Sequence, residues 1–131
     1  MLISNETPLI SNLNMAENIA LIKEVHEGMS IKAAEGLACE YLEKIGMGSI
    51  ALKRISACQS VEIFYVMLIR ALMMPQEQIC ILAPFLLIKH LSGLDELLAN
   101  IALLNDKKDI IILDTYSNEL HYKGCECHIV K

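Results

Sequence analysis

The sequence has 131 residues, which is the size of one domain, or of one domain and part of another. Hydrophobic residues make up 54% and the formal net charge is −5, so the basic stripe of a nucleic-acid-binding protein is not expected. A chain this small has too little interior to hide so much apolar surface, which favours a partner or a self-association face.

Neither membrane-spanning nor secretory segments are expected. The longest apolar stretches, residues 63–69 and 79–88, are shorter than the roughly 20 residues that a membrane-spanning helix needs. The N-terminal MLISNETPLIS lacks the basic and apolar regions of a signal peptide. The five cysteines show no disulfide framework, so we expect a cytoplasmic protein with free thiols and with Cys39 and Cys80 in the core.

The first half of the chain predicts two amphipathic helices after a polar, turn-rich segment over residues 1–12. The first spans Met15–Glu27 and stops at Gly28, a residue that suits the C-terminal end of a helix. Its apolar face is expected to comprise Ile19, Ile22 and Val25, flanked by Met15 and Leu21.

The second helix is expected over Ile31–Ile45, with Ser30 as its N-cap and Gly46 as its stop. Apolar residues spaced three or four apart predict the apolar side of this helix. The start of the helix also belongs to the expected partner-contact surface described below. Its members are Ile31, Ala34, Leu37, Ala38, Tyr41 and Ile45.

The second half predicts alternating strands and helices. Glu62–Met73 is apolar nearly all round, which is typical of a helix docked on several sides, and Pro75 ends it. Ile79–Leu82 is a short apolar run of the kind found in a central parallel strand. An amphipathic helix is expected over Leu94–Leu104 and a second buried strand over Asp109–Leu113.

A short helix after the capping residue Ser117, reaching about Tyr122, and a final strand over Cys127–Val130 complete the pattern. The predicted fold class is α/β, with a helical part first and a partial parallel sheet after it.

The stretch from Lys53 to Phe85, KRISACQSVEIFYVMLIRALMMPQEQICILAPF, resembles the signature helix and Walker B strand of ABC transporter ATPases. The segment from Ser4 to Ile19 is similar to the Q-loop and the first helix of that family's helical subdomain, and its Leu13-Asn14 and Glu17-Asn18-Ile19 are well kept. The resemblance covers nearly the whole chain.

The resemblance implies the C-terminal half of a P-loop NTPase-like domain, with the Walker A half missing. Residues 1–75 would be the Q-loop and a remnant of the helical subdomain with the signature helix. Residues 76–131 would be a partial α/β core with the Walker B-like strand, a helix, the H-loop-like strand and a terminal helix and strand.

Measured against the family's motifs, this chain is degenerate. The Q-loop Gln falls on Asn5, and the LSGGE signature falls on Cys58–Glu62, where only Glu62 agrees. The two signature glycines are Ser60 and Val61, and a β-branched side chain blocks the close approach of backbone N–H groups to a phosphate.

The Walker B acids are replaced as well. Leu82 and Ala83 stand where the family has the Mg²⁺-holding Asp and the catalytic Glu, and Thr115 stands at the H-loop His. The D-loop is either Ser92–Asp95 or lost in Leu86–Lys89. No GxxxxGK[ST] phosphate loop occurs in the sequence. We therefore expect no catalytic residues and no ATPase activity from the chain alone.

Other polar residues favour structural roles. Cys125-Glu126-Cys127-His128 cannot wrap a tetrahedral zinc ion, so no metal site is expected. Asp114 follows a strand and is expected to cap or stabilise a turn. His26, His90 and His121 are expected at the surface or in packing contacts.

Our first hypothesis is a non-catalytic interaction or regulatory module of a transport complex. The resemblance implies contact with a permease or ATPase subunit, at the cytoplasmic side of a membrane and with no cofactor bound by the chain alone. The expected contact residues are Thr7, Leu9, Ile10, Ser11, Asn12, Leu13 and Met15, together with the helix that starts at Ile31.

Two alternatives stay open. A separate polypeptide carrying the Walker A half would complete the sheet, and ATP with Mg²⁺ would bind only then. In the other alternative the chain has no nucleotide role and assembles with itself through strand edges and apolar faces, as a dimer or a higher oligomer.

Overall fold

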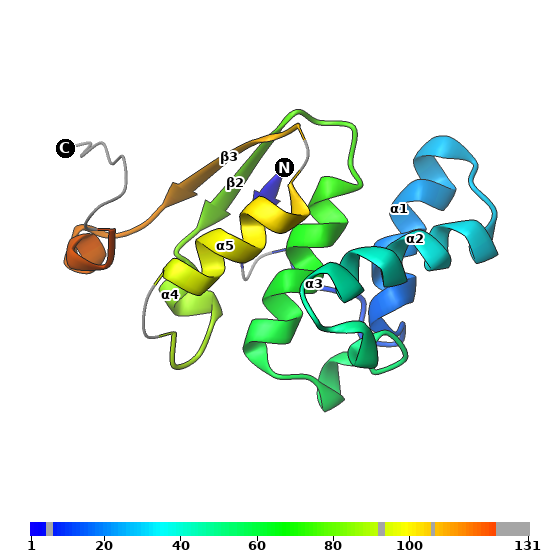
Figure 1. The fold of residues 1–131 in the computed structure, drawn as a ribbon, viewed down its shortest axis with the longest axis horizontal. Coiled ribbons are helices and arrows are strands. Elements are labelled where there is room, and N and C mark those ends of the chain that lie inside the picture. The colour runs from blue at the N-terminus through cyan, green and yellow to red at the C-terminus, as the bar shows by residue number, and fades with distance from the viewer. Residues whose placement is uncertain (5–6, 92–93, 106, 123–131) are drawn as a thin grey trace.

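Five α-helices and a three-stranded parallel sheet make up the described part of the chain, residues 1–4, 7–91, 94–105 and 107–122, in the computed structural model (Figure 1). The strands are β1 (Leu2–Ile3), β2 (Gln78–Leu82) and β3 (Asp109–Leu113). The helices are α1 (Met15–Glu27), α2 (Ile31–Lys44), α3 (Ser60–Leu72), α4 (Pro84–Leu87) and α5 (Asp95–Leu104). Short 3₁₀ helices cover Gly48–Ile50, Ile55–Ala57 and Tyr116–Tyr122.

Helix α1 has the predicted bounds because both of its ends carry strong capping signals. The backbone N–H of Glu17 donates to the Asn14 side chain at 2.7 Å, and the Glu17 carboxylate accepts from the Asn14 N–H at 3.0 Å. Gly28 ends the helix in the left-handed conformation, with φ of 65°. The predicted apolar face is wrong at Val25, which is 70% exposed, because only the N-terminal half of α1 packs into the core.

Helix α2 starts after Ser30, as predicted, and the Ser30 hydroxyl accepts from the Ala33 N–H at 3.2 Å. The prediction that Ile31 belongs to the buried side is wrong, since Ile31 is 63% exposed in the first turn. Ala34, Ala38 and Leu42 are the residues of α2 that are buried. The two helices pack against each other as a pair.

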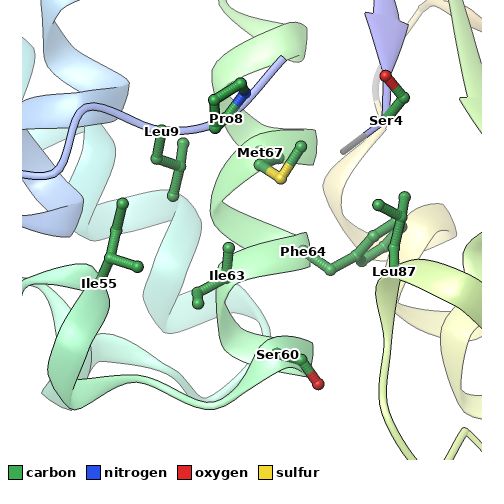
Figure 2. A pocket seen from close by; sticks show the side chains of 9 residues that line it. All are labelled: Ser4, Pro8, Leu9, Ile55, Ser60, Ile63, Phe64, Met67 and Leu87. Atoms are coloured by element: carbon green, nitrogen blue, oxygen red, sulfur yellow. The ribbon is translucent and has the colours of Figure 1, made fainter. Parts of the chain in front are cut away.

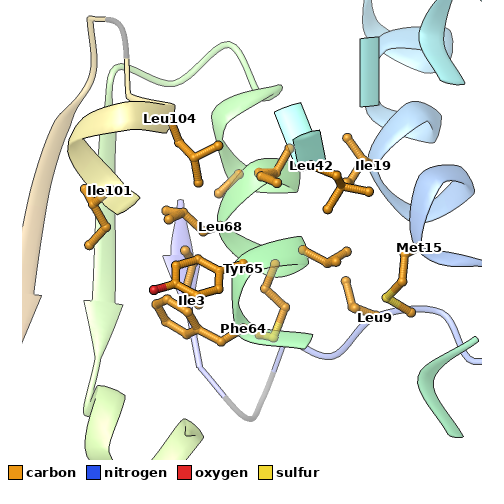
Figure 3. Close-up of a cluster of buried hydrophobic side chains, with 14 of the residues drawn as sticks. Ile3, Leu9, Met15, Ile19, Leu42, Phe64, Tyr65, Leu68, Ile101 and Leu104 are labelled. Atoms are coloured by element: carbon orange, nitrogen blue, oxygen red, sulfur yellow. The ribbon is translucent and has the colours of Figure 1, made fainter. Parts of the chain in front are cut away.

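Helix α3 is the centre of the hydrophobic core (Figure 3). It begins two residues before the predicted start, and every residue from Phe64 to Ile69 is buried, which confirms a helix docked on several sides. The Asn100 amide of α5 donates to the Tyr65 hydroxyl at 3.0 Å. Burial raises the pKa of Tyr65, so this hydroxyl stays protonated at neutral pH.

Strand β2 is central, as predicted, between β1 and β3, and all pairs are parallel. Ile3 pairs with Ile81, and Ile81 pairs with Ile112. The sequence analysis missed β1, because a strand of two residues has no measurable periodicity. These pairings place Ile3, Ile79 and Ile81 on one face of the sheet, where all three are buried.

The prediction that β3 is buried is wrong. Its side chains alternate between half-buried and exposed, and it is an edge strand. The connections β1 to β2 and β2 to β3 step across the sheet in the same direction, so right-handed crossovers place α3 and α5 on the same face. The opposite face receives no helix from the described residues.

Three smaller expectations have different outcomes. Cys39 and Cys80 are half-buried rather than in the core. The short helix expected after Ser117 is a 3₁₀ helix over Tyr116–Tyr122. The predicted strand over residues 127–130, and the Cys125–His128 segment with it, lies outside the described residues.

Candidate functional site

The loop between β1 and α1 is fixed to the last turn of α3 by one arginine. The Arg70 guanidinium donates to the carbonyl oxygen of Thr7 at 2.8 Å and to that of Pro8 at 3.2 Å. Burial lowers the pKa of Arg70, because the desolvated cation is less stable than a solvated one. The side chain therefore depends on these two carbonyl oxygens for hydrogen bonds.

A buried asparagine fixes the other end of the same loop. Asn18 of α1 is 2% exposed, and its amide oxygen accepts from the Ile10 N–H at 2.7 Å. Its amide nitrogen donates to the carbonyl oxygens of Ile10 at 3.1 Å and Asn14 at 3.0 Å. Asn18 therefore supplies hydrogen-bond partners for both the N–H and the carbonyl oxygen of Ile10, which lie partly buried in the loop.

The start of the loop is closed by Thr7. Its hydroxyl lies 3.2 Å from the Ser4 N–H and within 3.2 Å of the carbonyl oxygens of Leu2 and Ser4. Thr7 is therefore hydrogen-bonded to both Leu2 and Ser4.

The loop exposes only part of the surface expected from the sequence. Leu9 and Met15 lie in the core, so their predicted direct contact with a partner is corrected: both side chains are already buried within the chain. Thr7 and Leu13 are half-buried. Ile10, which is 42% exposed, Ser11 and Asn12 remain available to a partner.

An apolar cavity of about 220 Å³ lies beside the loop (Figure 2). It is bordered by the loop, by the N-terminal half of α3 and by the residue at the end of α4. The lining residues are Ser4, Pro8, Leu9, Ile55, Ser60, Ile63, Phe64, Met67 and Leu87. No charged side chain lines it, so it offers a phosphate group no counter-charge.

The signature-like residues Cys58–Glu62 form the start of α3. The Ser60 hydroxyl accepts from the Lys89 N–H at 2.9 Å, and the Glu62 carboxylate accepts from the Gln59 N–H at 2.8 Å. Val61 is half-buried. Burial, aided by the nearby Glu62 carboxylate, raises the pKa of the Cys58 thiol, so it stays protonated and weakly nucleophilic. These side chains serve helix capping and packing.

The C-terminal end of β2 carries Leu82 and Ala83. Leu82 is exposed on the sheet face without a helix. Ala83 has φ of 51° and ψ of 65°, a left-handed conformation that costs a non-glycine residue about 1–2 kcal/mol. Its N–H donates to the Leu113 carbonyl oxygen at 2.7 Å, a hydrogen bond that extends the pairing of β2 and β3.

Asp114 follows β3 and stabilises the turn after it, as predicted. One carboxylate oxygen accepts from the Thr115 N–H at 2.7 Å and from the Asn118 amide at 2.9 Å, and the other accepts from the Tyr122 hydroxyl at 2.7 Å. The Thr115 hydroxyl lies 2.8 Å from that of Ser117. Both carboxylate oxygens of Asp114 therefore stabilise the turn after β3.

The remaining candidates are dispersed. His121 stacks on Phe85, with ring centroids 4.3 Å apart, which confirms a packing role, while His26 is exposed. Asn5, and Ser92 and Gly93 of one possible D-loop, lie outside the described residues. In the other possible D-loop, Leu86 and Leu87 belong to α4.

Two further findings concern the whole described part of the chain. Among its residues, no group of three or more His, Cys, Asp and Glu side chains is placed to hold a metal ion. None of its helices is both long and apolar enough to cross a bilayer.

Comparison with known proteins gives a fold and no family. No protein-family model matches the sequence. No curated protein matches it either. Among solved structures, the dimeric post-hydrolysis state of the ATP-binding cassette MJ0796 bound to ADP and Pi matches with a TM-score of 0.69 at 19% identity. The match covers 89% of this chain and 52% of that chain, so this chain spans about half the length of its structural neighbour.

The class of fold follows from this match. Helices packed on one face of a small parallel sheet correspond to part of the ABC ATPase fold. The fold expected from the sequence is thereby confirmed.

The role of Asn18 predicts a stability difference between two asparagines. Asn18→Ala removes the partners of the Ile10 N–H and carbonyl oxygen, and we expect a loss of about 2–4 kcal/mol in the free energy of unfolding. Asn12→Ala, at an exposed position, should change it by less than about 0.5 kcal/mol. Urea denaturation measures both, and equal losses would show that Asn18 does not fix the loop.

The left-handed conformation of Ala83 predicts that glycine at this position raises the free energy of unfolding. Ala83→Gly removes the strain at φ of 51°, and after the added entropy of the unfolded chain we expect a gain of about 0.5–1 kcal/mol. The matched change Ala99→Gly, in the middle of α5, should cost about 1 kcal/mol. Both values come from urea denaturation, and a loss at both positions would contradict the strain at Ala83.

Proposed function

We propose that this chain is a degenerate, non-catalytic ABC ATPase-like protein that acts as an interaction or regulatory module of a transport complex. Its proposed partner is a permease or ATPase subunit, reached at the cytoplasmic side of a membrane. The fold match to an ATP-binding cassette supports the starting point of this proposal.

The observation that carries the proposal is a contrast between two parts of the site. The loop before α1 is held at both ends, by Arg70 and by Asn18, and keeps Ile10, Ser11 and Asn12 at the surface. Because this short exposed segment is already held in one conformation, less conformational entropy is lost when a partner binds it.

The strand ends, in contrast, offer little to a nucleotide. Leu82 and Ala83 have no carboxylate for Mg²⁺ and no base for water, and both oxygens of Asp114 accept hydrogen bonds from its own turn. Ser60 and Val61 replace the glycines that would bring backbone N–H groups to a phosphate, and the Ser60 hydroxyl already accepts from the Lys89 N–H. Transport-related binding without turnover is therefore the function that these residues support best.

Nucleotide binding gives the direct test of the non-catalytic part. We expect isothermal titration of Mg-ATP into the chain to show no binding tighter than about 1 mM, because no charged side chain lines the cavity and the strand end lacks acids. The double variant Leu82→Asp, Ala83→Glu should not gain hydrolysis. Micromolar affinity in the unaltered chain would refute the proposal.

The surface of the loop gives the test of the partner part. Ile10→Asp places a charge at the centre of the proposed contact, and we expect co-purification with a permease subunit to fall by about tenfold or more. Leu103→Asp is the matched control, since Leu103 is 60% exposed and lies on α5 rather than beside this loop. Co-purification that responds equally to both variants would assign the contact to another surface.

A further inference from the structure

We draw no further inference here: the strongest candidate, the apolar cavity between the loop before α1 and the N-terminal half of α3, belongs to the site already described, and nothing in the structure shows what fills it.

Discussion

The burial of α3 on nearly all sides is the constraint on which the rest of the structure depends. Its residues from Phe64 to Ile69 are buried between the α1–α2 pair and the sheet, and Tyr65 reaches Asn100 of α5 (Figure 3). A helix in that position cannot shift without opening the core on every side. Because Arg70 belongs to the same helix, its hydrogen bond to Thr7 also fixes the loop after β1 to this rigid element.

The way these segments are held also explains how this fold can keep its packing while its motif side chains change. The groups that fix the loop, Arg70 and Asn18, act through backbone carbonyl and N–H groups, so they tolerate change in the loop's own side chains. At the strand end, the hydrogen bond from the Ala83 N–H to Leu113 likewise needs no particular side chain at position 83. A chain of this kind can keep its architecture while the residues that would handle a phosphate are replaced.

Local signals in the sequence were sufficient for the four long helices and for the bounds of β2 and β3, and insufficient for α4, for β1 and for the way the sheet is covered. Gly28 and Ser30 mark helix ends by their own backbone chemistry, so α1 and the start of α2 were predictable. Val25 and Ile31 were assigned to buried faces because periodicity ignores where a neighbouring element ends. The exposure of β3 depends on the direction of two crossovers, which no single window of residues encodes. The role of Asn18 depends on a loop that folds back on it, which hydrophobic periodicity does not show.

The pairing of Leu2 with Cys80 also has a consequence for synthesis. The first strand leaves the ribosome nearly eighty residues before its partner, a delay of about 4 to 16 seconds at ordinary elongation rates. The α1–α2 pair, which needs only neighbouring residues, can form in a small fraction of that time. We expect the sheet to close last around a preformed helical part, which leaves Leu2 and Ile3 dependent on solvent or chaperone contact until then.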